Sequence, residues 1–270
     1  MRNKMLFAVF SALVILALAV SPAAAVTDGQ PDGNGHPYVG LMVALDANHT
    51  PLWRCSGTLL SSTLFLTAGH CTEAPAVFAE IWFAADVQSG VPGNGYPYHG
   101  DVSGITHTHP LYDPNAFVLH DVGVVVLDHP VYMSTYGVLP AVNQLDALKT
   151  KRGQQNVTFT AVGYGLQKSF PDAAAWKEQS LKVRMVANPQ LLQINVPGFT
   201  GDFSMLLSNN ANTGGTCFGD SGGPNFLGNT NVVAGVTSFG INGNCAGTGG
   251  VFRMDRQNVQ DFINRYMIDD

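Results

Sequence analysis

The sequence has few charged residues, and basic residues are the scarcer sign. Charged side chains make up 12% of its 270 residues, and 13 Lys and Arg stand against 19 Asp and Glu, for a formal net charge of −6. A protein that binds nucleic-acid phosphates needs a basic stripe, so this composition argues against a nucleic-acid binder. Hydrophobic residues make up 46% of the chain, which is enough for a folded core and excludes disorder over most of it.

Long apolar runs and helical patterns are also scarce. After residue 25 no segment is apolar for long enough to span a membrane, and no repeat or low-complexity tract is present. The 30 glycines and 15 prolines are spread through the chain and favour many short strands and turns. This length fits either one large all-β unit or two small domains.

The first 25 residues have the pattern of a secretory signal peptide. Arg2 and Lys4 give a positive start, residues 5–20 are apolar except for one serine, and residues 21–25 are small residues and a proline. A single membrane anchor is the alternative. Cleavage after Ala25 would leave 270 − 25 = 245 residues with a net charge of −6 − 2 = −8. We therefore expect a secreted, extracellular protein that has no membrane segment after cleavage.

The chain has only four cysteines, and in a secreted protein an even number indicates disulfides. Four cysteines allow three pairings, and sequence spacing alone does not choose among them. None of the spacings is the C-x-x-C of a structural zinc site. We expect two local loops, closed by Cys55–Cys71 and Cys217–Cys245.

Several short segments have the composition of strands, and only one has the period of a helix. The strand candidates are residues 38–45, 56–60, 63–68, 122–127, 156–162, 181–186, 232–239 and 250–254. Near the C-terminus, Val259, Phe262, Ile263 and Tyr266 recur at helical spacing, with Asp255 placed to cap the first turn. The pattern predicts a barrel or sandwich with one helix packed against it.

The segment from Cys217 to Pro224 is the most specific indication of a catalytic residue. In it, Ser221 lies among three glycines and follows Asp220. Glycines let the backbone approach a bound group closely. The backbone N–H groups of Gly219 and Ser221 could therefore point at one oxygen and stabilise the negative charge of a tetrahedral intermediate. A surface turn without function is the alternative, because the same composition forms turns.

A serine hydroxyl becomes a good nucleophile only when a base removes its proton, so the eight histidines are candidates for that base. His70 follows an apolar run and lies next to Cys71, where a disulfide would fix its position. His107 and His109 would share a face of a strand, as in a metal site. No third ligand is evident nearby, so we expect no metal.

Asp121 opens the apolar run from Val122 to Leu127. A buried carboxylate is costly unless it is paired, and a histidine would be a suitable partner. The alternative, that Asp121 ends a strand at the surface, fits less well with the apolar residues that follow it.

His70, Asp121 and Ser221 follow one another in the order His, Asp, Ser. The chymotrypsin/trypsin-like serine proteases have the same order, and the chain resembles them. Three segments carry the resemblance: Thr67–Cys71, His120–Gly123 and Gly219–Pro224. Further segments, similar in order and spacing, are Cys55–Leu60, His109–Tyr112, Gly163–Gly165, Thr237–Gly240 and Gly249–Phe252. The resemblance covers essentially residues 26–270.

The resemblance implies two packed six-stranded antiparallel β-barrels, roughly residues 26–140 and 141–270, with the active site between them and the terminal helix on the second. It implies that His70 is the general base and then the general acid, that Asp121 orients it, and that Ser221 forms the acyl-enzyme. Gly219 and Ser221 would form the oxyanion hole. The same two disulfide pairings are implied, and no cofactor is expected.

The resemblance also places a specificity pocket. Its residues would be Gly215, Thr216, Ser238, Phe239, Gly240 and Gly250. Gly215, at the expected pocket base, has no charge to pair with an Arg or Lys side chain, so we expect a preference for a large apolar or aromatic residue.

Members of this family are usually activated when cleavage releases a new N-terminus, whose amine pairs with the Asp before the nucleophile. No basic cleavage site precedes the equivalent segment, and Val26 follows Ala25 directly. We therefore expect signal cleavage itself to release the Val26 amine, which then pairs with Asp220.

Two other classes of function remain open. One is a catalytically silent, protease-like binding module, and the other is an esterase that uses the same three residues. An α/β-hydrolase is disfavoured, because it needs alternating strands and helices and the order Ser, Asp, His. For the protease we expect a protein or peptide substrate and a monomer.

Overall fold

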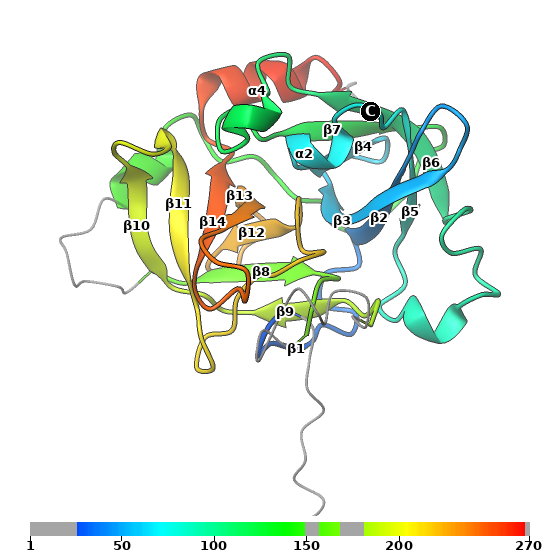
Figure 1. The fold of residues 1–270 in the computed structure, drawn as a ribbon, viewed down its shortest axis with the longest axis horizontal. Coiled ribbons are helices and arrows are strands. Elements are labelled where there is room, and N and C mark those ends of the chain that lie inside the picture. The colour runs from blue at the N-terminus through cyan, green and yellow to red at the C-terminus, as the bar shows by residue number, and fades with distance from the viewer. Residues whose placement is uncertain (1–25, 149–156, 168–180, 268–270) are drawn as a thin grey trace, which may run out of the picture.

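The computed structural model describes residues 26–148, 157–167 and 181–267. The expected signal peptide lies outside the described residues. Figure 1 shows two groups of strands side by side, with the earlier part of the chain mainly in the right-hand group and the later part in the left-hand group. The predicted all-β fold with two lobes and a C-terminal helix is confirmed. No helix in the described ranges is both long and apolar enough to cross a membrane.

The first lobe is a closed antiparallel barrel with the strand order β2-β3-β4-β7-β6-β5. Its strands are β2 (Val39–Leu45), β3 (Pro51–Leu59), β4 (Leu64–Thr67), β5 (Phe78–Trp82), β6 (Val102–Thr108) and β7 (Gly123–Leu127). All seven residues of β2 are buried, and β4 pairs with β7 with Phe65 opposite Val125. These strands are buried on both faces, and β-branched and aromatic side chains pack well in buried strands. This explains the Val-rich sequence of β7.

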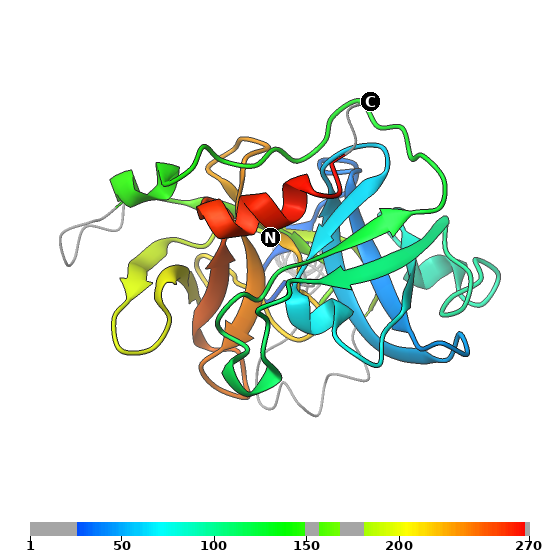
Figure 2. The ribbon, with the colours of Figure 1, turned by 90° about the horizontal axis from the view of Figure 1, so that it is seen from above.

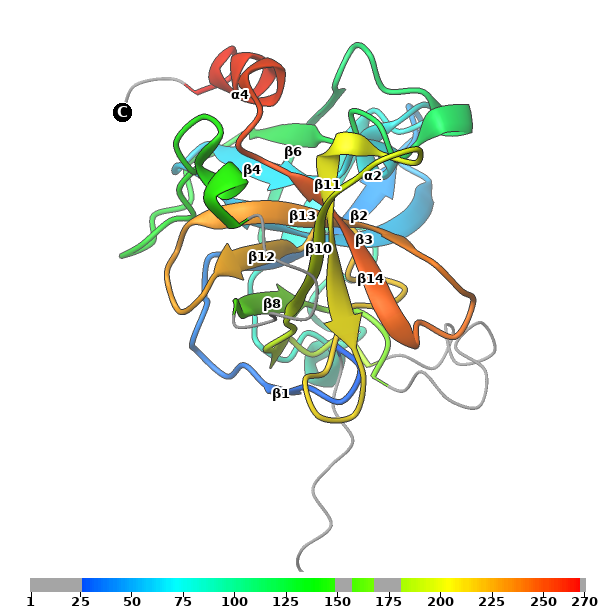
Figure 3. The same cartoon turned by 90° about the vertical axis from the view of Figure 1, so that its left-hand side faces the viewer.

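The second lobe is an antiparallel sheet of eight strands in the order β1-β9-β8-β12-β13-β14-β11-β10 (Figure 3). Its strands are β1 (Gln30–Pro31), β8 (Phe159–Gly163), β9 (Met185–Ala187), β10 (Leu191–Val196), β11 (Gly201–Asn209), β12 (Pro224–Leu227), β13 (Val233–Gly240) and β14 (Gly247–Arg253). Within the described residues this sheet curls as a half-barrel with β1 and β10 at its edges, whereas six strands in a closed barrel were expected.

The C-terminal helix α4 (Gln257–Asn264) follows β14 and lies across the top of the molecule in Figure 1 and over both lobes in Figure 2. Its buried side chains are the predicted Val259, Phe262 and Ile263. The predicted cap is wrong: Arg256 is the N-cap residue and makes no side-chain cap bond. Asp255 is instead fully buried, where its carboxylate accepts hydrogen bonds from the Arg253 guanidinium and the Leu145 N–H.

One hydrophobic core extends through both lobes. It contains barrel residues such as Leu41 and Val124, second-lobe residues such as Val236 and Phe252, and the buried face of α4. The ring of Phe262 also contacts His109, which follows β6 of the barrel. The helix therefore packs against the first lobe as well as the second, and the shared core fixes how the two lobes face each other.

Candidate active site

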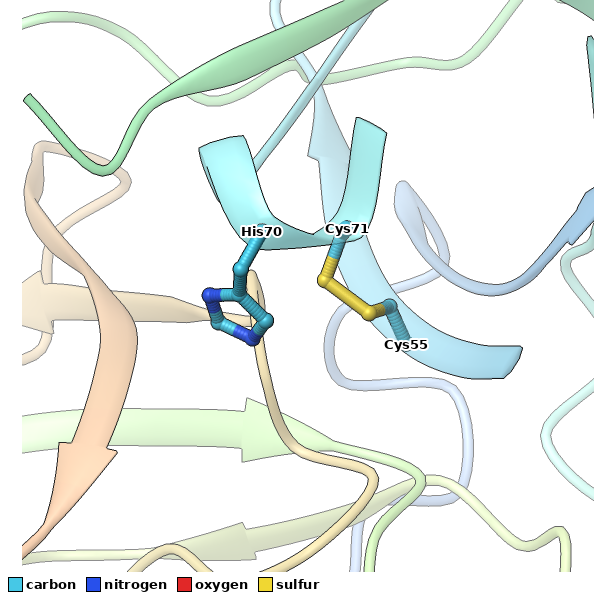
Figure 4. Close-up of side chains that lie close together, drawn as sticks. All are labelled: Cys55, His70 and Cys71. Atoms are coloured by element: carbon cyan, nitrogen blue, oxygen red, sulfur yellow. A yellow bond between two sulfur atoms is a disulfide. The ribbon is translucent and has the colours of Figure 1, made fainter. Parts of the chain in front are cut away.

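His70 lies in the short helix α2 (Gly69–Thr72), which begins two residues after β4 ends. The next residue, Cys71, forms a disulfide with Cys55 of β3 (Figure 4). The helix is thus tied to the wall of the barrel, which fixes the backbone from which the imidazole projects. The second disulfide joins Cys217 to Cys245, close to the serine in the other lobe.

Asp121 immediately precedes Val122 and β7 and is fully buried. Its carboxylate accepts hydrogen bonds from the His70 backbone N–H at 2.9 Å and lies 3.0 and 3.1 Å from His70 Nδ1. Ser238 Oγ, on β13 of the second lobe, donates a further bond to it. Three groups therefore share the charge of the buried carboxylate, as a buried charge requires.

The contact with Asp121 determines which nitrogen of His70 carries the proton. An ionised carboxylate only accepts hydrogen bonds, so Nδ1 is the protonated nitrogen and Nε2 is left to accept a proton. Burial lowers the pKa of His70, but the charge and hydrogen bond of Asp121, together with the charge of Glu73, outweigh burial and leave that pKa raised. This geometry suits an imidazole that acts as a base and is stabilised once it becomes an imidazolium.

Ser221 lies in the loop between β11 and β12, where positive-φ glycines set a close approach to the first lobe. Gly222 has φ +76°, and a Cβ there would lie 2.0 Å from Thr67 Oγ1 of β4. The carbonyl of Ser221 accepts a hydrogen bond of 2.8 Å from Ser56 N–H of β3. The loop can therefore dock against the barrel only with glycine at position 222.

His70 and Ser221 line one cavity of about 610 Å³, together with Trp53, Cys55 and Gly219. Among the hydrogen bonds of the described residues, none joins His70 to Ser221. Such bonds are often long in a free enzyme and tighten when substrate is bound. The structure thus brings the predicted base, its carboxylate partner and the predicted nucleophile to the same place between the two lobes.

The backbone N–H groups of Gly219 and Ser221 have no acceptor within the described ranges. Both residues line the cavity that contains His70, and Gly219 has φ +94°. Their neighbours Asp220 and Gly222 donate normally, to the carbonyls of Cys217 and Thr237. An oxyanion hole requires two such donors that point at one oxygen.

A second cavity, of about 430 Å³, also meets Ser221. Four predicted pocket residues line it: Thr216, Ser238, Phe239 and Gly240.

The two other predicted pocket residues do not line this cavity. Gly215 is buried against the side chain of Asn209, whose Cγ would lie 2.2 Å from an added Cβ. Gly250 faces the ring of Phe239, with ring carbons 2.3 Å from an added Cβ. Both glycines therefore make room for a neighbouring side chain of the second lobe.

Asp220 is fully buried, and its carboxylate accepts hydrogen bonds from Gly165 N–H at 2.8 Å and Cys217 N–H at 2.9 Å. Burial raises its pKa to about 7, against the opposing effects of these two bonds and of the charge of Arg54. In the part of the chain that the structure describes, it forms no ion pair. A buried carboxylate of this kind is stabilised when a cation binds beside it.

Val26 is also fully buried, beside Met185 and Ala187 of the second lobe. The next residue, Thr27, accepts a hydrogen bond from Gly215 N–H at 3.0 Å and donates one to Asn209 Oδ1 at 2.6 Å. The start of the described chain is thus held inside the second lobe, near the segment that leads to Ser221.

Among the described residues, one cluster has potential metal ligands close together: Cys55, His70 and Cys71. Figure 4 shows the two cysteines joined as a disulfide beside the imidazole. Disulfide sulfurs lack the thiolate that binds a metal, so this cluster fits no metal ion. His107 and His109 instead stack against Tyr266 and His120, respectively.

The sequence did not predict the hydrogen bond between Ser238 and the Asp121 carboxylate. Ser238 was expected only as part of the pocket wall, yet its hydroxyl bonds to Asp121 from the opposite lobe. The motif that contains Ser238 was visible in the sequence. The direction of its side chain was not, because it depends on how β13 faces the barrel.

The sequence model of the family described as Trypsin matches residues 29–263. Serine protease 1 and Serine protease 2 of Drosophila melanogaster are each 28% identical over 223 residues, which cover 82% of this chain and 77% of each relative. Collagenase of Hypoderma lineatum is 26% identical over 215 residues, covering 77% of this chain and 74% of the relative.

Two solved structures show the same fold. HL collagenase superposes with a TM-score of 0.65 at 22% identity and covers 88% of this chain and 97% of its own. Human heparin binding protein has a TM-score of 0.63 at 18% identity and covers 88% and 95%. The match of the family model over residues 29–263, on a fold of this type, shows that the chain belongs to the trypsin family.

Proposed function

We propose that this protein is a secreted serine endopeptidase in which His70, Asp121 and Ser221 form the catalytic triad. The observation that carries the proposal is the pairing of His70 Nδ1 with the buried Asp121 carboxylate, on the wall of a cavity that Ser221 shares. The serine protease and collagenase relatives support hydrolysis of protein substrates by this chain as well. No cofactor takes part in this chemistry.

In the first half of the reaction, Ser221 Oγ attacks the carbonyl carbon of the scissile bond while His70 Nε2 takes the hydroxyl proton. Asp121 stabilises the resulting imidazolium through Nδ1–H. When the C–N bond breaks, His70 returns that proton to the leaving amine, and the acyl group remains on Ser221. Water then repeats the sequence, which releases the carboxylic acid and restores the serine.

Gly219 and Ser221 supply the oxyanion hole in this proposal. As the carbonyl carbon becomes tetrahedral, its oxygen gains negative charge, and two N–H groups without other acceptors can bond to it. In enzymes of this type a single donor of this kind contributes about 10²–10³ in kcat.

The cavity of about 430 Å³ is proposed to hold the side chain of the residue before the scissile bond. It meets Ser221 and is lined by Phe239 and Ile241 among others, and no lining residue is charged. Phe117 and Phe199 are exposed, and each ring meets the Phe239 ring in a T-shaped arrangement, which extends the apolar surface beside the cavity. We therefore propose a preference for large apolar or aromatic residues, because a Lys or Arg would be buried without a partner.

Val26 and Asp220 are proposed to be the activation pair. Cleavage after Ala25 would release the Val26 amine inside the second lobe, where Val26 is already buried and Thr27 is bonded to Gly215. The buried Asp220 carboxylate would then gain a cation and hold the loop of Ser221 in place. N-terminal sequencing of the secreted active protein tests this step: the expected start is Val26, and any other start contradicts it.

The test of the proposed function is peptide-library profiling of the secreted protein and of Ser221→Ala. The wild type should cleave peptides mainly after Phe, Tyr, Leu or Met, and the variant should show no cleavage above background. Cleavage mainly after Arg or Lys would contradict the pocket proposal. Absence of cleavage by the wild type would contradict the endopeptidase and favour a binding module.

A further inference from the structure

Ser56, on β3 of the barrel, makes an unusual set of contacts with the loop that carries Ser221. Its side chain is fully buried, and its Oγ donates a hydrogen bond to the Gly219 carbonyl at 2.8 Å. The same Oγ accepts one from Tyr164 N–H at 2.9 Å, and Ser56 N–H donates to the Ser221 carbonyl at 2.8 Å. A single residue of the first lobe thus holds two carbonyls of the proposed oxyanion loop.

The bond from Ser56 Oγ acts on the peptide unit that lies between the two proposed oxyanion donors. The Gly219 N–H shares a peptide plane with the Phe218 carbonyl, which accepts a bond from Leu166 N–H at 2.8 Å. The Ser221 N–H shares a plane with the Asp220 carbonyl, which accepts one from Gly223 N–H at 2.8 Å. The intervening plane contains the Asp220 N–H, which donates to the Cys217 carbonyl at 3.0 Å, and the Gly219 carbonyl, which accepts from Ser56 Oγ.

The carbonyl side of this plane needs a restraint because Gly219 has no side chain of its own. With φ +94°, Gly219 occupies a region that only glycine enters easily, and glycine also leaves it easily. Because this plane links the two planes that carry the donors, its orientation sets the angle between the Gly219 and Ser221 N–H groups. A bond from a buried hydroxyl on the other lobe holds that orientation.

We propose that Ser56 is a positioning residue that holds the Gly219 peptide so that both oxyanion donors converge on the substrate carbonyl oxygen. The inference rests on the proposed function, because it assigns a role within the same reaction. Ser56 touches neither the substrate nor the reacting atoms. Its effect passes through Gly219, and it should therefore appear in the transition state more than in substrate binding.

The experiment compares Ser56→Ala with a matched control, Thr160→Val. Thr160 is also buried, on β8 of the second lobe, and its hydroxyl donates at 2.7 Å to the Gly228 carbonyl. Both variants lose one buried hydroxyl, and only Ser56→Ala frees the Gly219 carbonyl. We measure kcat and KM on the p-nitroanilide of the peptide that library profiling finds best cleaved.

Ser56→Ala should lower kcat about tenfold, less than the ~10²–10³ of an absent oxyanion donor, with KM within about twofold. The inhibition constant of the matching peptidyl trifluoromethyl ketone, which forms an oxyanion on Ser221, should rise by the same factor. The inhibition constant of the peptide amide, which forms none, should stay unchanged. Thr160→Val should keep the wild-type kcat within about twofold.

An active wild type with equal kcat values for the two variants would overturn the positioning role and leave the proposed function intact. A wild type without turnover would contradict the proposed function itself. If Ser56→Ala does not fold, Ser56→Gly removes the same hydroxyl, and it is measured in the same way.

Discussion

The two lobes contribute to the candidate site in different ways. The closed barrel carries His70 and Asp121, which are bonded directly to each other. The half-barrel sheet carries Ser221 and the cavity beside it, on loops rich in glycine. The proposed base and its carboxylate are therefore oriented within one lobe, whereas the proposed base and the proposed nucleophile meet only across the interface. The packing of the lobes is thus part of the proposed catalytic geometry.

Specific polar contacts fix that packing. Ser238 Oγ of the second lobe bonds to Asp121 of the first, and Ser56 N–H of the first bonds to the Ser221 carbonyl of the second. Away from the site, the buried Arg184 guanidinium donates to the Val39 carbonyl of β2 at 3.1 Å. The shared core holds the two lobes together, and these hydrogen bonds fix the position of one lobe relative to the other.

The largest effect is expected within the first lobe. Asp121→Asn should lower kcat by about 10⁴ at neutral pH, because an amide no longer fixes the Nδ1–H form of His70 or stabilises the imidazolium. Steady-state kinetics on the best peptide substrate measures this, with circular dichroism to show that the fold is kept. A loss of less than about tenfold would contradict the assignment of Asp121.

The second lobe offers a contrasting change that should affect stability without affecting chemistry. Asp255→Ala leaves the buried Arg253 guanidinium without its bidentate partner, so we expect a loss of roughly 3–5 kcal/mol in the free energy of unfolding. At a temperature where the variant is folded, kcat should be unchanged. Thermal unfolding is the measurement.

The matched control for Asp255 is Asp261→Ala on the exposed face of α4, where the carboxylate accepts a hydrogen bond from the Gln257 side chain at 2.8 Å. It should change the unfolding free energy by no more than about 0.5 kcal/mol. Equal destabilisation by the two variants would show that the buried network around Arg253 has no special role.

A smaller effect is expected for the bond that crosses the interface. Ser238→Ala removes a hydroxyl from the buried Asp121 carboxylate, and loss of a hydrogen bond to a charged group costs about 1.5–3 kcal/mol. We expect kcat/KM to fall roughly 10- to 100-fold, mainly in kcat. If only KM changed, Ser238 would act through the pocket alone.

The smallest expected change concerns pH. Asp121 keeps the pKa of His70 above the ordinary histidine value of 6.5, so the imidazole stays protonated and unable to act as a base until the pH exceeds that value. Activity should therefore rise with pH through a midpoint above 6.5. The pH dependence of kcat/KM measures this, and a midpoint below 6.5 would contradict the pairing with Asp121.

The sequence predicted those elements whose side chains are apolar throughout, such as β2 and β7. It missed β5 because Glu80 interrupts the strand, yet the Glu80 carboxylate is satisfied by Gly100 N–H and Ser103 Oγ after folding. The cap at Asp255 failed for a similar reason, since Arg253 offers a buried partner that local pattern does not show.

At the site, the chemistry limits the residue types to a nucleophile, a base and an acid, and the resemblance to the trypsin-like proteases implied the order and the roles of His70, Asp121 and Ser221. The sequence could not give the contacts that cross between the lobes. Ser56 and Ser238 act through the direction of their side chains, which depends on the packing of two sheets that are distant in sequence. Gly215 and Gly250 similarly make room for Asn209 and Phe239 of neighbouring strands.

The proposed triad is tested most directly by labelling the secreted protein with a fluorophosphonate, followed by mass spectrometry of the adduct. We expect one adduct, on Ser221, with no label on Ser221→Ala and much slower labelling of His70→Ala. The first result requires a nucleophile from the second lobe that is activated by a base from the first. No label on the wild-type protein, or an adduct on another residue, would contradict the proposed triad.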